Sequence, residues 1–592
     1  MKINHRCAAI LATLAMMFGG AAACQAGLGV TYVKTLGQNN PTGQPLKGTG
    51  LRQLAVDTEG NLYYAIIRGW PWTSLVKVAP GGRVIWETEC GGYSAVPVTI
   101  ADGHLYALSQ SEIRRFSLAA GQRDADWGGK LPATLREVAA LQIAGTYLFL
   151  VDKAGHELHR FDRATLDEKP FATRVMVVEP VDCALARNGN LLILTAETVL
   201  EVDPNGRPVR VPLIDGLHGA QGMAVDPRTG LIFVMQGGIP GSLVNQIWQY
   251  DADGKPTGVK LGRGGDFNGK WSPDSFAFSS GYAAFALDAQ GGLWVNNALG
   301  QLVHFKAGEK FMADQTLVGL SLGGVGATGI AVDDQLNLYV GMNVGGLKLS
   351  WDNQVVWTSG LQISGDGARF PSSPVNGWPV YVACAGAKGP VFYSTHDGTA
   401  WLLSPATGEL LGTRAGPGQG GSLFLRAAGD SLFLKTGNSG QISQGAPETI
   451  GDWKAWKSFL TLPADLKAGQ LVGGSRDQAR IYLHDGKTLF CVGKDGKRLW
   501  ETAAPAIGYV FPVAFLRDDV MFLNLAGKTT ALDARTGEKL AEIGTEPAAD
   551  GRPALGGGGG FAVGSKGGKD YLFVLGNYQV QVFEITTTVG AK

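Results

Sequence analysis

The stretch GIAVDDQLNLYVGM at residues 329–342, followed by GLKLSWDNQVVW at 346–357, decides the fold of this chain. An apolar strand leads into a turn that begins with Asp, and a second strand of Leu-aromatic-Val type follows. A third strand then ends in another polar turn. Short apolar strands separated by turn residues predict an antiparallel sheet in which consecutive strands pair.

The same unit recurs along the whole chain. Copies include LAVDTEGNLYYAI at 54–66, GMAVDPRTGLIFVMQ at 222–236, FALDAQGGLWVNN at 285–297 and TTALDARTGEKLAEI at 529–543. The apolar residue that opens each second strand recurs about every 46 residues, which is the length of a four-stranded propeller blade. These residues are Leu62, Leu105, Leu148, Leu192, Ile232, Leu293, Leu338, Val391, Leu432, Ile481, Val520 and Leu572.

This repeat predicts an all-β protein of β-propeller repeats, with about twelve blades in two six-bladed rings. The 87 glycines, about twice the usual share, agree with many tight turns. A chain of 592 residues also exceeds the roughly 250–300 residues that one core supports. We expect a first propeller over 27–318 and a second over 319–592; seven and five blades is the alternative division.

Two further elements are predicted outside the repeat. The strand at Val30–Leu36 is expected to be the outer strand that closes the first ring. The segment 451–467 (GDWKAWKSFLTLPADLK) is expected to hold a short helix within a loop.

The charge balance excludes one class of partner. Lys+Arg and Asp+Glu are both 51, so the formal net charge is zero. Nucleic-acid binding needs a basic face that displaces counterions from phosphates, and no Lys/Arg cluster provides one. We therefore expect no nucleic-acid partner.

The N-terminus has the order of a secretory signal peptide. Lys2 and Arg6 precede the apolar stretch 7–18, and small residues follow over 19–26. We expect 1–26 to be removed and the protein to be periplasmic or extracellular, without a transmembrane segment. Alternatively, Ala-Ala-Ala before Cys24 resembles a bacterial lipoprotein box, in which case acylated Cys24 anchors the protein to a membrane.

The remaining cysteines give no metal or redox motif, because they are far apart in the sequence. Two of them, Cys183 and Cys491, lie inside apolar strand patterns, which favours buried free thiols. A disulfide among Cys90, Cys183, Cys384 and Cys491 stays open at this point, since an exported protein permits one.

Two family resemblances follow from these motifs. The first half, with LAVDTEGNLYYA at 54–65 and VKVAPGGRVIW at 76–86, resembles NHL-type six-bladed propeller repeats. The second half, with LFCVGKDGKRLWE at 489–501 and TTALDARTGEKLAEI at 529–543, resembles the repeats of the pyrroloquinoline-quinone (PQQ) propeller superfamily. Both resemblances imply the fold and say little about the activity.

The enzymatic relatives differ from this chain at their functional residues. Quinoprotein dehydrogenases carry two adjacent cysteines over the cofactor, and this sequence has no adjacent pair. Gluconolactonase-like propellers open on a metal-binding Glu, whereas residues 51–54 here are Leu-Arg-Gln-Leu. No residue pattern therefore supports Ca²⁺ or PQQ, and the cofactor remains unknown.

Four carboxylates recur at the same turn. Asp57, Asp226, Asp288 and Asp333 each end a first strand, where Asp accepts hydrogen bonds from nearby backbone N–H groups. We interpret them as turn caps and not as a ring of metal ligands.

The resemblance implies that ligands bind on the face where the loops converge around the ring axis. The loops assigned to that face combine Trp with Asp and Asn, which suits stacking on and hydrogen bonding to a sugar; packing between blades is the alternative role of the Trp residues. The candidate ligand-binding residues are Trp70, Trp72, Asp266, Asn268, Trp271, Asp274, Asn296, Asn297, Asn343, Trp378, His396 and Asp397.

The sequence thus favours an exported binding or scaffold protein that presents this face to a protein or carbohydrate ligand. The alternative is an enzyme, either a metal-dependent hydrolase or lyase acting on a carbohydrate or lactone, or a degenerate quinoprotein dehydrogenase.

Overall fold

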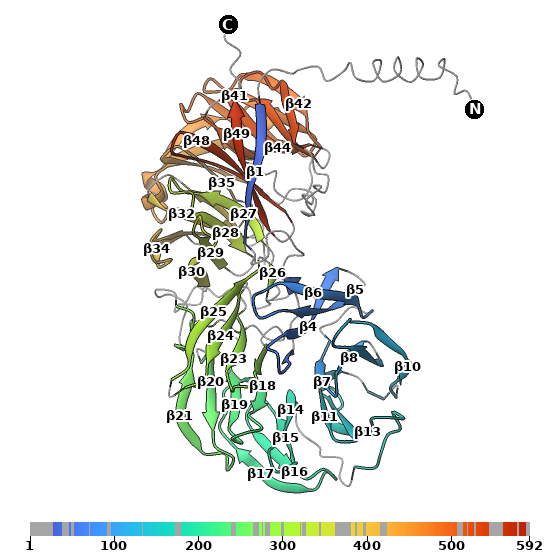
Figure 1. Ribbon diagram of the computed structural model, residues 1–592. Coiled ribbons are helices and arrows are strands. Elements are labelled where there is room, and N and C mark those ends of the chain that lie inside the picture. The colour runs from blue at the N-terminus through green and yellow to red at the C-terminus, as the bar shows by residue number, and fades with distance from the viewer. Residues whose placement is uncertain are drawn as a thin grey trace, which may run out of the picture.

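The fold is all-β and is built from antiparallel sheets that form two propeller rings, seen as two lobes in Figure 1. In the described part of the chain the blade sheets have four strands, except the third, which has three. The structure is a computed structural model. It describes residues 28–37, 47–48, 53–69, 72–91, 96–109, 111–132, 134–135, 137–171, 179–237, 244–264, 272–274, 276, 278, 284–297, 301–308, 310–319, 321–322, 327–342, 345–360, 380–384, 388–394, 398–414, 423–437, 439–505, 513–517, 519–525, 528–543, 560–576 and 579–587.

Ring 1 contains six consecutive sheets in the described part of the chain, which we number blades 1 to 6. The ring is closed, because the inner strand of blade 6 lies against the inner strand of blade 1, and Leu54 and Leu62 pack with Trp294 and Leu302. From inner to outer strand the blades are β3 (Leu54–Val56), β4 (Leu62–Gly69), β5 (Trp72–Val78), β6 (Val84–Glu89); β7 (Val98–Ala101), β8 (His104–Ser109), β9 (Glu112–Ser117), β10 (Arg123–Lys130); β11 (Val138–Ala144), β12 (Tyr147–Asp152), β13 (Glu157–Asp162); β14 (Asp182–Leu185), β15 (Leu191–Leu194), β16 (Val199–Val202), β17 (Pro208–Ile214); β18 (Ala220–Val225), β19 (Ile232–Gln236), β20 (Gln246–Tyr250), β21 (Pro256–Leu261); and β22 (Ala284–Leu287), β23 (Leu293–Asn297), β24 (Gln301–Lys306), β25 (Met312–Val318).

Ring 2 contains the next six sheets of the described chain, blades 7 to 12. This ring is also closed, because β27, the inner strand of blade 7, lies against β47, the inner strand of blade 12. Its blades are β27 (Ala327–Val332), β28 (Leu338–Met342), β29 (Gly345–Leu349), β30 (Val355–Gly360); β31 (Val380–Cys384), β32 (Pro390–Ser394), β33 (Ala400–Leu403), β34 (Leu410–Arg414); β35 (Leu423–Ala428), β36 (Ser431–Thr436), β37 (Gln441–Gly445), β38 (Lys457–Thr461); β39 (Gln470–Gly474), β40 (Arg480–His484), β41 (Thr488–Gly493), β42 (Arg498–Ala503); β43 (Val513–Leu516), β44 (Val520–Leu525), β45 (Lys528–Asp533), β46 (Lys539–Ile543); and β47 (Gly560–Lys566), β48 (Lys569–Leu575), β49 (Val580–Thr587), β1 (Leu28–Leu36).

The first strand of the chain closes ring 2, so the expectation that Val30–Leu36 closes ring 1 is wrong. Strand β1 pairs with β49 in antiparallel register, with Leu28 opposite Thr587 and Leu36 opposite Val580. Figure 1 shows β1 in blue among the red strands of the last blade. The β1 side chains alternate between half-buried and exposed, and that pattern suits the outer edge of any blade.

The two segments that connect the rings also meet. Strand β2 (Lys47–Gly48) lies between β1 and ring 1, and β26 (Ser321–Leu322) lies between ring 1 and ring 2. They pair in parallel, with Lys47 opposite Ser321. Both crossings between the rings therefore run through one small sheet.

The predicted helix at 451–467 is also wrong. The segment contains the outer strand β38 between two 3₁₀ turns, η4 (Trp453–Ala455) and η5 (Ala464–Leu466), and a third turn, η3 (Pro447–Thr449), precedes it. Strand β38 pairs with β37, with Gln441 opposite Thr461. Hydrogen bonding to the free edge of β37 outweighs the local helical pattern of this segment.

The repeat positions explain the core. All twelve apolar residues that were predicted to open second strands lie on second strands, and they are buried. The turn aspartates act as caps, as predicted: Asp57 Oδ1 accepts from the Glu59 and Asn61 backbone N–H groups at 2.9 Å each. Asp333 makes the same two contacts in ring 2, at 3.0 and 2.9 Å.

Tryptophans on outer strands link neighbouring blades. In blades 1, 7 and 10 the outer-strand tryptophan Nε1 donates to a backbone carbonyl in the next blade's outer turn, at 3.1 to 3.2 Å. The indole of each of these tryptophans also covers a glycine of that turn. The pairs are Trp86 with Gly121, Trp357 with Gly408 and Trp500 with Gly537.

Candidate functional site

The two faces of each ring differ in the connections that they carry. Strands alternate in direction within a blade, so turns from first to second and from third to fourth strand lie on one face. Connections from second to third strand, and from one blade to the next, lie on the other. We call the latter the loop-bearing face; its counterpart is the turn-bearing face.

A polar link crosses the axis of ring 1 at the loop-bearing face. Gln53, next to blade 1, donates from Nε2 to Asp182 Oδ1 of blade 4 at 3.3 Å. The Oε1 atom of Gln53 accepts from the backbone N–H of Val98 in blade 2 at 3.0 Å. One amide side chain thus connects three blades.

Asp182 is the carboxylate of this link and is 9% exposed. It accepts from its neighbour's backbone, Cys183 N at 2.8 Å, and from Met223 N of blade 5 at 2.9 Å. Burial raises the pKa of the Asp182 carboxyl to about 6, although the three hydrogen bonds lower it in part. Asp182 therefore begins to take up a proton near neutral pH.

Amide side chains continue the polar edge into blade 5. Gln221 donates from Nε2 to the Gly237 carbonyl at 2.6 Å, and in the described part of the chain its buried Oε1 has no hydrogen-bond partner. Asn245 is 5% exposed and accepts from the backbone N–H of Phe278 at 3.3 Å.

Blade 6 adds two amides that are completely buried. Asn296 and Gln301, at the ends of β23 and β24, are both 0% exposed. Gln301 shares a strand face with Val303, which packs against Phe233 and Met235 of blade 5. Among the described residues, neither Oε1 nor Nε2 of Gln301 has a hydrogen-bond partner.

These side chains all lie at the loop-bearing ends of strands in or next to blades 1, 4, 5 and 6, and we call them the amide rim. Apart from Asp182 its side chains are neutral amides, which both donate and accept and which match ligands rich in hydroxyl groups. A buried amide without a partner costs about 1–3 kcal/mol, which a ligand hydrogen bond would recover. The amide rim consists of Gln53, Asp182, Gln221, Asn245, Asn296 and Gln301.

Few of the candidate residues from the sequence can be placed. Asn296 lies on the amide rim. Asp274 lies between blades 5 and 6, where its carbonyl accepts from Arg263 N at 3.0 Å and its carboxylate accepts from Ser272. Asn297 ends β23 opposite Gln301, and Trp72 begins β5. The remaining candidates lie outside the described residues: Trp70, Asp266, Asn268, Trp271, Asn343, Trp378, His396, Asp397 and Cys24.

Five residues of the amide rim are not among the candidates from the sequence, because those candidates came from loops that combine Trp with Asp, Asn and His. They are Gln53, Asp182, Gln221, Asn245 and Gln301. The available signal was an amide at the end of an apolar strand, as in the stretch QLVHF that Gln301 opens. A polar side chain in a strand that is buried on both faces needs a hydrogen-bond partner, so such a residue in an apolar strand is a candidate for binding a ligand.

The described residues offer little to a metal. No group of three or more His, Cys, Asp or Glu side chains in that part of the chain is placed to hold an ion. Within the described residues no disulfide is formed, and Cys183 and Cys491 are buried thiols, as predicted. Burial raises the pKa of the Cys90 thiol to about 11.

Within the described part of the chain, no helix is long and apolar enough to cross a membrane.

The chain has distant structural similarity to several solved structures. No protein-family model and no curated protein matches the chain. Among solved structures, the Niastella koreensis GH74 enzyme is 10% identical, covers 90% of each chain and has a TM-score of 0.42. The extracellular domain of the one-component system BT4673 from B. thetaiotaomicron is 11% identical over 93% of this chain and 83% of its own, with a TM-score of 0.30. Virginiamycin B lyase from Staphylococcus aureus is 12% identical over 53% of this chain and 95% of its own, with a TM-score of 0.32.

Proposed function

We propose that this chain is an exported binding protein whose ring 1 holds a neutral, hydroxyl-rich ligand, a carbohydrate, at the amide rim. The observation that carries the proposal is Gln301, whose amide is fully buried and has no partner in the described structure. Such a group is unfavourable in the free protein and gains hydrogen bonds when a ligand supplies hydroxyls.

The composition of the amide rim supports a neutral ligand. Five of its six side chains are uncharged amides, and the sixth, Asp182, is held by three donors. Sugars present adjacent hydroxyl groups that pair well with amides and carboxylates. The tryptophans expected on the same face from the sequence would add stacking surface.

Binding is favoured over hydrolysis by what faces Asp182. Hydrolysis of a glycosidic bond commonly uses two carboxyl groups on either side of the bond. In the described part of the site, the side chain facing Asp182 is the amide of Gln53, which can hold a ligand but cannot transfer a proton as an acid.

The test is a glycan array probed with the purified full chain, followed by calorimetric titration of the strongest binder. The titration compares wild type, Gln301→Leu and the matched control Gln249→Leu. Gln249 lies in the same ring on β20, away from the amide rim, with its Oε1 accepting from Thr257 at 2.8 Å.

We expect a neutral glycan to bind, with affinity at least tenfold weaker in Gln301→Leu and unchanged in Gln249→Leu. Absence of glycan binding, or equal affinity of wild type and Gln301→Leu, would overturn the proposal. Mass spectrometry of the recovered glycan distinguishes binding from cleavage, and a shortened product would establish the enzymatic alternative.

A further inference from the structure

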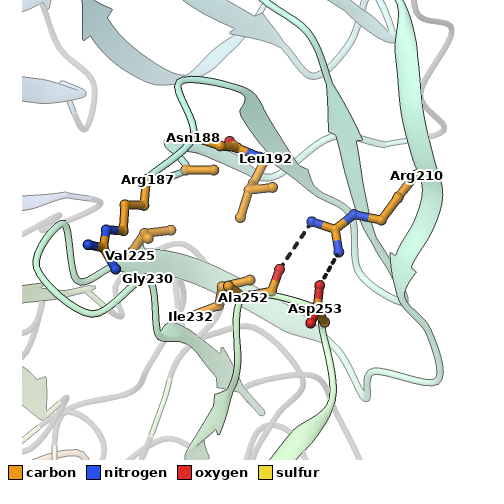
Figure 2. Close-up of a pocket in the computed structure, with 10 residues that line it drawn as sticks. Arg187, Asn188, Leu192, Arg210, Val225, Gly230, Ile232, Ala252 and Asp253 are labelled. Atoms are coloured by element: carbon orange, nitrogen blue, oxygen red, sulfur yellow. Dashed lines mark hydrogen bonds and ion pairs between the residues drawn. The ribbon is translucent and has the colours of Figure 1, made fainter.

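A cavity of about 420 Å³ lies between blades 4 and 5 of ring 1. Its walls come from the first turns of both blades, from the outer turn of blade 5 and from β17. These connections belong to the turn-bearing face, so the cavity is separate from the amide rim. Figure 2 shows Leu192 projecting into its centre, with Arg187 on one side and Arg210 on the other.

The cavity coincides with a place where other blades carry a tryptophan. In blades 1, 7 and 10, the strand register puts Trp86 opposite Lys77, Trp357 opposite Lys348 and Trp500 opposite Cys491. The same register in blade 4 puts Arg210 opposite Glu201.

Arg210 also makes the contact that those tryptophans make. It donates to the Ala252 carbonyl, in the outer turn of the next blade, at 3.1 Å. A tryptophan ring fills the space against that turn, whereas the slender arginine chain reaches across it. The missing aromatic ring accounts for the open volume.

The two arginines of the cavity differ in their charge balance. Arg210 is neutralised by Glu201, which is completely buried, and it donates to Asp253 at 3.1 Å. Arg187 is exposed, and among the described residues it has no ion pair or hydrogen bond. The Arg187 guanidinium at this cavity therefore has N–H donors that no described residue engages. The aliphatic walls beside it come from Leu192, Val225 and Ile232.

We propose that this cavity is a second binding site, for a small aromatic carboxylate. The aromatic ring occupies the volume that a tryptophan fills in other blades and stacks on the Arg210 guanidinium, which is a favourable cation–π arrangement. The carboxylate pairs with Arg187, whose planar donors match its two oxygens.

The test uses indole-3-acetate as the probe, titrated calorimetrically into the purified full chain. Indole-3-ethanol carries the same ring without the charge. The variants are Arg187→Gln, the matched control Arg207→Gln in the neighbouring outer turn, and the double variant Glu201→Cys/Arg210→Trp. The double variant copies the Cys491–Trp500 pair of blade 10 and fills the cavity.

We expect saturable binding of indole-3-acetate that weakens at least fivefold in Arg187→Gln, is unchanged in Arg207→Gln and disappears in the double variant. Indole-3-ethanol should bind wild type and Arg187→Gln equally. The proposal fails if wild type shows no saturable binding, or if Arg187→Gln binds indole-3-acetate as tightly as wild type. Because Arg187 is exposed, Arg187→Gln should fold normally. It therefore tests the proposal even if the double variant does not fold.

Discussion

The amide of Gln301, which has no partner in the described part of the chain, leads to an uncommon prediction: a substitution in the proposed binding site stabilises the fold. Replacing Gln301 with Leu keeps a side chain of similar volume and removes two polar atoms that, among the described residues, are buried without partners. A buried polar group without a hydrogen bond costs about 1–3 kcal/mol, and an apolar group of similar shape does not incur that penalty.

We therefore expect Gln301→Leu to raise the free energy of unfolding by about 2 kcal/mol, a shift of roughly 5 °C in the melting temperature of ring 1. Scanning calorimetry measures this, together with Gln301→Asn as the control. Asn keeps the amide and leaves a small cavity, so it should destabilise the ring.

A decrease of more than about 1 kcal/mol in the free energy of unfolding of Gln301→Leu would refute the reasoning. It would mean that ordered water or protein already satisfies the amide in solution. In that case Gln301 would have no unmet hydrogen bonds to offer a ligand. The proposed function requires that Gln301→Leu is more stable than wild type and also binds the glycan more weakly.

Three further outcomes are expected. The raised pKa of Asp182, about 6 against an ordinary 3.8, means that this group's stabilisation is complete at low pH and is lost as the pH rises through 6. The stability of wild type relative to Asp182→Asn should thus fall by about 2 kcal/mol between pH 4.5 and 7.5 in denaturant titrations, and a flat difference would contradict the shift. Gly408→Ala should destabilise ring 2 by about 3 kcal/mol in calorimetry, because the new Cβ would lie 2.7 Å from the Trp357 ring at a backbone φ of +74°; an unchanged melting temperature would show that this contact is loose. Deleting residues 28–36 should lower the melting temperature of ring 2 and leave that of ring 1 intact, and the opposite result would contradict the pairing of β1 with β49.

The repeat made most of the fold predictable from the sequence. Residues such as Leu62 and Leu572 are spaced by the blade length, and their burial follows from the apolar strands around them. The turn carboxylates were also predictable, because the role of Asp57 depends only on its own turn.

Long-range pairing was not predictable in the same way. The alternation in Val30–Leu36 fits any outer edge, and nothing local distinguishes β49 as its partner. The candidate site had the same difficulty, since the link between Gln53 and Asp182 joins blades that are far apart in the sequence. Only the closed ring brings these two residues together.

The pairing of β1 with β49 determines the order in which the molecule can be completed. Ring 2 stays open until the last strand of the chain is available, whereas ring 1 needs only residues that precede β26. A finished ring 1 also holds Lys47 beside Ser321, which shortens the effective loop that β1 must close and so reduces its entropic cost. Ring 1 then serves as an internal scaffold, and ring 2 acquires its final stability only when β1 pairs with β49.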